Sequence, residues 1–259
     1  MYLRAVHAES SIAVLQQLIR DHPLGILTTA LQSPSHPLIQ SSHIPFVLDV
    51  PDSDAADADG GPPRGILRGH MAKQNPQAKV LMEALAAQRE QGQTASLELP
   101  DEVLVLFTSP CHHYVTPKFY TETKPATGKV VPTWNYAAVQ AYGKISVYCD
   151  SKSEQTSAFL QKTVEDLSQF CETSIMGYAS SPWKVSDAPA PYIDLLKKNI
   201  IGVEIRIERL EGKFKMSQEM GHGDREGVIR GFDALGTDVG KGVSRLVKER
   251  GELKDQQKK

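Results

Sequence analysis

The chain has 259 residues, 40% of them hydrophobic and 23% charged, which is the balance of an ordinary globular protein. A formal net charge of -2 argues against a protein held to DNA or to a membrane by bulk charge. The three cysteines have no CxxC spacing, and no apolar run approaches the ~20 residues that span a bilayer. We therefore expect a cytoplasmic protein without a disulfide framework, a metal site or a membrane anchor.

The N-terminal half predicts a helix, three strands and a second helix. Ser10 or Ser11 precedes apolar residues at helical spacing, and Asn75 followed by Pro76 is a typical N-cap and first-turn pair. An acidic, Gly/Pro-rich loop over 51–63 has little to bury, so we expect it to be mobile. The expected elements are a helix over 12–21, strands over 24–29, 41–49 and 65–71, and a helix over 76–91.

The C-terminal half adds strands and helices without a regular βαβ alternation. Strands are expected over 103–107, 135–148 and 201–208, and helices over 152–172 and 192–199. Residues 108–130 have no clear period, and residues 221–224 resemble a turn. Residues 233–259 form a charged tail, of which 241–259 is expected to extend into solvent. This order favours a β-rich α+β fold, an antiparallel barrel with peripheral helices.

The first candidate site is the junction LRGHMAKQNP, where a predicted strand ends and a helix begins. Backbone N–H groups at a helix start can meet an anion, and Arg68 and Lys73 add positive charge. His70 and Asn75 bring polar groups to the same junction. The alternative is structural: Asn75 caps the helix, His70 is packed, and the two cations are solvated.

The second candidate is the segment KVVPTWNY. Lys129, Trp134, Asn135 and Tyr136 combine a cation, flat aromatic surface and an amide, which is the mixture that a planar heteroaromatic ligand needs. In the structural alternative both aromatic residues belong to the core and Asn135 shapes a turn.

A third segment, TSPCHHYVTP, contains Cys111, His112 and His113. Imidazole and thiolate are common ligands for metals and haem. Adjacent side chains in an extended segment point in opposite directions, however, so the two histidines are not expected to converge on one ion. A structural role is favoured over a metal site.

The order of these motifs closely resembles the PaiB-like family of FMN-binding split-barrel proteins, whose bacterial members are described as negative transcriptional regulators. The resemblance covers residues 1–232, and its most specific stretches are RGHMAKQNP, KVVPTWNY, WKVSDAP and LEGKFKMSQ. The tail over 233–259 lies outside it. The loop at 51–63 and one extra residue in FTSPCH depart from the family pattern.

The resemblance implies a split β-barrel, a homodimer, and FMN in a cleft between the subunits. Arg68 is added to the family-derived residues from the charge argument above. The candidate cofactor-binding residues are Arg68, His70, Lys73, Asn75, Lys129, Thr133, Trp134 and Asn135.

Three functions stay open at this point. The first is a flavin-dependent oxidoreductase or flavin-linked sensor, for which no acid or base can be named. The second is a transcriptional regulator, although there is no helix-turn-helix pattern and direct nucleic-acid binding is not expected. The third is haem binding or haem degradation, with His7, His70, His112 and His113 as available axial ligands.

Overall fold

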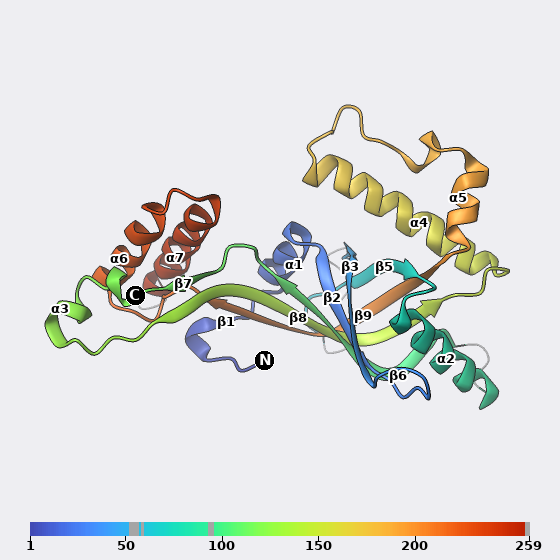
Figure 1. Ribbon diagram of the computed structural model, residues 1–259, viewed down its shortest axis with the longest axis horizontal. Helices are drawn as coiled ribbons and strands as arrows, with labels where there is room; N and C mark the ends of the chain where they lie inside the picture. The colour runs from blue at the N-terminus through green and yellow to red at the C-terminus, as the bar shows by residue number, and fades with distance from the viewer. Residues whose placement is uncertain (52–56, 58–59, 93–95, 257–259) are drawn as a thin grey trace. The chain divides into compact units, whose positions relative to one another are not determined.

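The computed structural model of the protein describes residues 1–51, 57, 60–92 and 96–256 (Figure 1). The chain divides into two compact units. Unit 1 consists of residues 1–18, 107–140 and 211–259, and unit 2 of residues 19–106 and 141–210. Most of the loop expected to be mobile, 51–63, lies outside the described residues.

Unit 2 is built on an antiparallel sheet. Its strands run in the order β3-β2-β6-β8-β9-β5-β4, and the pairs β2–β3, β2–β6, β4–β5 and β5–β9 are antiparallel. The bounds are β2 (Leu24–Ala30), β3 (Ile39–Pro45), β4 (Val47–Asp49), β5 (Ile66–Ala72), β6 (Glu98–Thr108), β8 (Thr133–Tyr148) and β9 (Ile200–Lys215). The predicted class, an antiparallel β-rich fold with peripheral helices, is confirmed.

The sheet of unit 2 curls until β3 meets β5, which is not its neighbour in the strand order. Gly69 of β5 permits this approach. A Cβ atom on Gly69 would lie 2.9 Å from Ile44 Cγ2, closer than side chains tolerate, and 3.1 Å from Phe46 Cδ1, which is also a tight contact. Because Ile44, Phe46 and Leu67 are all buried, the curl encloses an apolar core, as in a barrel-type sheet.

Helices flank this sheet. The helix α2 (Pro76–Glu90) begins after Asn75, as predicted, and α4 (Glu154–Phe170) packs against β4 and β5. After α4 come a π-helical turn (Cys171–Ile175), a 3-10 turn (Val185–Asp187) and α5 (Ala190–Lys197). The rings of Tyr148 and Phe159 stack with centroids 3.8 Å apart, which fixes α4 beside the end of β8.

Unit 1 contains short N-terminal elements, one end of β8 and of β9, and two C-terminal helices. The loop expected over 108–130 contains a short strand, a 3-10 turn and a short helix. The elements are a 3-10 turn (Ala5–His7), β1 (Ala8–Glu9), the first part of α1 (Ile12–Asp21), β7 (His113–Val115), a 3-10 turn (Pro117–Phe119), α3 (Thr123–Thr127), α6 (His222–Asp233) and α7 (Asp238–Gln256). Strand β1 pairs with β9, and β7 pairs with β8.

Two expectations about the C-terminal region are wrong. Residues 221–224 are not a free turn, because Gly221 is the N-cap of α6. The part of the charged tail expected to extend into solvent is instead helical up to residue 256, within α7. Val243 and Val247 of α7 are buried, and small residues beside them allow close packing: a Cβ atom on Gly251 would lie 2.8 Å from Arg225 Nε. A short apolar stripe with small neighbours is therefore enough to dock this helix.

Candidate functional site

The strand-to-helix junction of unit 2 positions His70, Lys73 and Asn75. The Asn75 side chain accepts a hydrogen bond from the Gln77 backbone N–H at 2.9 Å and donates one to Ser42 Oγ at 2.9 Å. The Lys73 backbone N–H donates to the Asn199 carbonyl, also at 2.9 Å. These bonds fix the start of α2 and leave the half-buried Lys73 side chain beside it.

His70 is half-buried on β5, and its Nδ1 atom is buried without a hydrogen-bond partner among the described residues. Burial lowers the pKa of His70 below its usual value, because the charged imidazolium loses hydration. At neutral pH the side chain is therefore a neutral imidazole with an unfilled hydrogen-bonding position.

Arg68 lies on the same strand in a different environment. Only 4% of the residue is exposed, and its guanidinium forms ion pairs with Asp49 of β4 and, at 2.6 Å, with Asp166 of α4. These contacts raise its pKa, the hydrogen bond that the guanidinium donates to Asp49 being the main cause. The guanidinium already has two carboxylate partners, so in this arrangement it holds β4, β5 and α4 together.

The second predicted segment lies in unit 1, where β8 begins. Lys129 is exposed in the stretch after α3, while Thr133 is half-buried. Trp134 is 50% exposed, and its indole N–H lies 3.3 Å from His112 Nδ1. The indole therefore offers an accessible flat surface that a neighbouring side chain orients.

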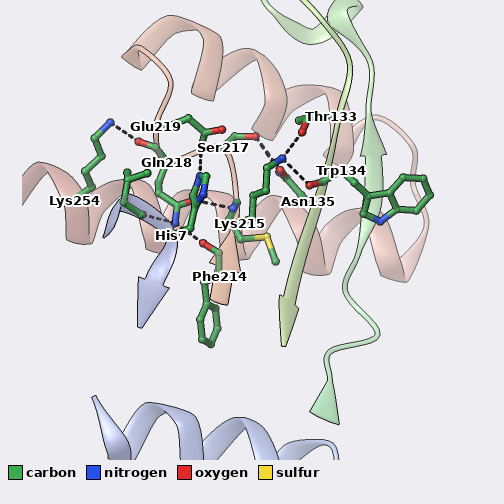
Figure 2. A network of polar contacts seen from close by, with 12 residues as sticks. His7, Thr133, Trp134, Asn135, Phe214, Lys215, Ser217, Gln218, Glu219 and Lys254 are labelled. Carbon is green, nitrogen blue, oxygen red and sulfur yellow. Dashed lines mark hydrogen bonds and ion pairs between the residues drawn. The ribbon is translucent and has the colours of Figure 1, made fainter. Parts of the chain in front are cut away.

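Asn135 points the other way along the strand and is fully buried (Figure 2). Its side chain exchanges two hydrogen bonds with the Ser217 hydroxyl, at 3.0 and 3.2 Å. Ser217 is also fully buried and has a φ of 58°, the left-handed region that a non-glycine residue rarely adopts. The Asn135–Ser217 pair thus holds an unfavourable backbone conformation just after β9 ends.

Sequence reasoning missed Lys215, at the end of β9. Its ammonium donates to Thr133 Oγ1 and, at 2.9 Å, to the Trp134 carbonyl (Figure 2). The cation attached to the KVVPTWNY segment is therefore Lys215, whereas Lys129 is solvent-exposed. The motif LEGKFKMSQ could have indicated Lys215, because its two lysines alternate with the apolar residues that face the core.

The histidines of TSPCHHYVTP diverge, as expected. His112 lies against Trp134, whereas the ring of His113 meets that of Phe232 with centroids 5.5 Å apart. Among the residues described, no group of three or more His, Cys, Asp or Glu side chains could hold a metal ion.

The eight predicted residues divide between the two units. Arg68, His70, Lys73 and Asn75 belong to unit 2, and Lys129, Thr133, Trp134 and Asn135 to unit 1. Within unit 2, Asn75 caps the start of α2, whereas Arg68 lies in an ion-pair cluster with Asp49 and Asp166. Within unit 1 it joins Thr133 and the Trp134 carbonyl to Lys215, and Asn135 to Ser217.

Unit 2 also has a hollow of about 290 Å³ on its surface, next to the Arg68 ion-pair cluster, because Asp166 is part of its lining. It lies between α4 and the following 3-10 turn, and its lining includes Glu165, Asp166, Trp183 and Lys184. In the ranges that the structure covers, no helix is long and apolar enough to cross a bilayer.

Comparison with known proteins identifies relatives that match most of the chain. Residues 1–209 match the family model described as "Putative FMN-binding domain". Protein AN0679 of Emericella nidulans is 73% identical, over 98% of this chain and 99% of its own. The protease synthase and sporulation protein PAI 2 of Bacillus subtilis is 25% identical, over 88% of this chain and 85% of its own. The solved structure of Rv2991 from Mycobacterium tuberculosis is 13% identical, covers 86% of this chain and 95% of its own, and has a TM-score of 0.44.

Proposed function

Because the chain belongs to the family of FMN-binding domains, we propose that it is a flavoprotein that uses FMN for oxidation and reduction. One observation carries this proposal: the family match over residues 1–209 includes all eight candidate cofactor residues, from Arg68 to Asn135. The flavin-linked sensor is the variant of this function in which the same redox change alters binding to a partner.

The residues of unit 2 suit the phosphate end of FMN. A phosphate needs cations and free N–H groups, and Lys73 stands at the start of α2 with the neutral, unfilled imidazole of His70 on the preceding strand. Arg68 stays a prediction, but its two carboxylate partners make Lys73 the stronger candidate for the phosphate.

The residues of unit 1 suit a planar ring. The exposed indole of Trp134 gives contact area, and the bonds of Lys215 to Thr133 and to the Trp134 carbonyl hold the backbone beneath it. FMN, when bound, supplies transfer of one or two electrons, while these side chains bind and orient it.

An absorption spectrum of the purified protein, followed by FMN titration, tests the proposal. We expect a flavin spectrum or tight uptake of added FMN. Lys73→Met and Trp134→Ala should each weaken FMN binding by about tenfold, the effect of one lost charge-assisted bond or ring contact. Lys79→Met is the matched control, because Lys79 is an exposed cation in the first turns of α2, the helix that follows Lys73. A protein that takes up no FMN, or shows a Soret band instead, would overturn the assignment.

We also propose that the protein is a cytoplasmic homodimer. The three cysteines, Cys111, Cys149 and Cys171, are free thiols, as expected in a reducing compartment. The dimer follows from the family resemblance, and light scattering coupled to size-exclusion chromatography tests it. A monomer at all concentrations would contradict the dimer without affecting FMN binding.

A further inference from the structure

Three cations gather in unit 1 where the N-terminal segment crosses the end of β9. Lys213 and Lys215 lie two residues apart on β9, so their side chains share one face. Strand β1 pairs Ala8 with Lys213, and the Lys213 ammonium donates to the Tyr2 carbonyl at 3.0 Å. The segment that carries Arg4 is therefore held along the same stretch of β9.

This cluster, Arg4, Lys213 and Lys215, has excess positive charge. Within the part of the chain that the structure describes, no ion pair joins any of the three to a carboxylate. The two ammonium groups donate hydrogen bonds to neutral oxygens: the Thr133 hydroxyl and two backbone carbonyls.

The pKa of Lys215 is lowered, mainly by burial. The Glu219 carboxylate raises it by more than either Lys213 or Arg4 lowers it, and that carboxylate also lies 3.0 Å from His7 Nε2. Lys213 and Arg4 add repulsion between like charges. An anion placed among the three cations would relieve both the repulsion and the cost of burial.

Aromatic rings border the cluster. The Lys213 ammonium lies 5.7 Å from the centroid of the Tyr2 ring and 5.5 Å from that of Tyr136. Tyr2 is 77% exposed, so one face of its ring is open to a ligand. A cationic group beside exposed aromatic surface matches a molecule that carries both a phosphate and a planar ring.

We propose that Arg4, Lys213 and Lys215 form a second anion-binding site, which takes an organic phosphate of the nucleotide type. The phosphates contact the three cations, and the base packs on Tyr2. Lys213 and Lys215 lie beyond residue 209, where the match to the family model ends, although both belong to the LEGKFKMSQ stretch of the family resemblance. Lys215 also bonds Thr133 and the Trp134 carbonyl, so the anion site borders the candidate flavin residues, and saturation with FMN tests that the two sites are separate. The ligand of the anion site is a substrate or effector distinct from the flavin.

Calorimetric titration of the FMN-saturated full chain with inorganic pyrophosphate, and then with ADP, tests the site. Lys213→Met, Lys215→Met and Arg4→Gln should each weaken pyrophosphate binding by about tenfold, the loss of one charge-assisted hydrogen bond. Lys248→Met is the matched control, an exposed cation on α7 that should change nothing. ADP should bind more tightly than pyrophosphate, and Tyr2→Ala should remove that advantage.

Four results would overturn the site: no pyrophosphate binding by the wild type, equal losses in the Lys248→Met control, binding that FMN saturation abolishes, or equal affinity for ADP and pyrophosphate. Arg4 is exposed, so Arg4→Gln stays informative even if a lysine variant fails to fold. If the chain takes up no FMN, the same titration without flavin still decides the anion site, and the two failures are separate.

Discussion

Arg68 illustrates how one buried cation organises its surroundings. Its guanidinium is almost fully buried, whereas the carboxylates of Asp49 and Asp166 are partly exposed. Removing a carboxylate leaves a buried charge with fewer partners, but removing the cation leaves carboxylates that water can solvate. The two kinds of substitution should therefore have unequal effects.

We predict that Asp49→Asn lowers the free energy of unfolding by about 2 kcal/mol, the cost of a lost hydrogen bond to a buried charge. Arg68→Met should cost less, because its methylene stem keeps the packing. Urea denaturation measures both. Lys162→Met is the control: Lys162 pairs with Asp166 at the surface and should matter little. A larger loss for Arg68→Met would contradict this account.

The hydrogen-bonded pair Asn135–Ser217 also predicts that two substitutions differ in how much they destabilise the protein. Asn135→Ala should destabilise the protein by about 2 kcal/mol, because it leaves the buried Ser217 hydroxyl without its partner. Ser217→Gly loses the same bonds, but glycine adopts a φ of 58° without strain, which offsets part of the loss. Thermal unfolding compares the two variants. Ser217→Gly as damaging as Asn135→Ala would show that the left-handed conformation stores no strain.

Among the elements, the best predictions are those with a local signal. The N-cap of α2 was predicted from Asn75-Pro76 alone, and the side-chain bond to Gln77 confirms it. The strand predicted over 201–208 is real but continues to Lys215. The alternation of buried residues breaks over 208–211 and resumes from Gly212, in the part of β9 that belongs to unit 1. The helix α7 was missed because its core contact consists of two valines and small residues, a pattern that composition does not distinguish from a solvated tail.

The helix α7 therefore provides a test at the element scale. Val247→Ala should lower the free energy of unfolding by about 2 kcal/mol, since Val247 is fully buried and the substitution leaves a cavity. Leu253→Ala, on the same helix, should have almost no effect, because Leu253 is 47% exposed. Chemical denaturation of the full chain compares the two. Equal effects would mean that α7 is not docked through its valine face.

For the whole molecule, the sequence patterns predicted which segments contain the candidate residues. They did not predict which residues each of those side chains contacts. The pattern placed Trp134 and Asn135 on one strand, yet only tertiary structure shows that Asn135 turns inward to Ser217 while the indole stays exposed. The cation of this segment comes from Lys215, 82 residues from Thr133 along the chain. Pairing across such a separation is set by strand register, which no local pattern encodes.

Two half-buried histidines, His22 and His70, make the stability of the whole chain depend on pH. Burial lowers the pKa of His70 and of His22, in the latter case against the opposing charge of Asp21. The unfolded chain binds protons near the usual value of 6.5, but the folded chain does so only at lower pH. The unfolded state therefore holds more protons below that value, and folding loses stability as the pH falls.

We predict that the free energy of unfolding, measured in urea, falls as the pH drops below about 7, with a slope below ~1.4 kcal/mol per pH unit for each histidine because both side chains are partly exposed. The double variant His22→Gln, His70→Gln should flatten this slope. Asp166 and Asp224 do not contribute to this slope. Burial would raise the pKa of each, but stronger hydrogen bonds lower it below 3.8, so their stabilisation is lost only in more acidic solution. A slope unchanged in the double variant would mean that other groups control the acid response, and that His70 is not held neutral by its surroundings.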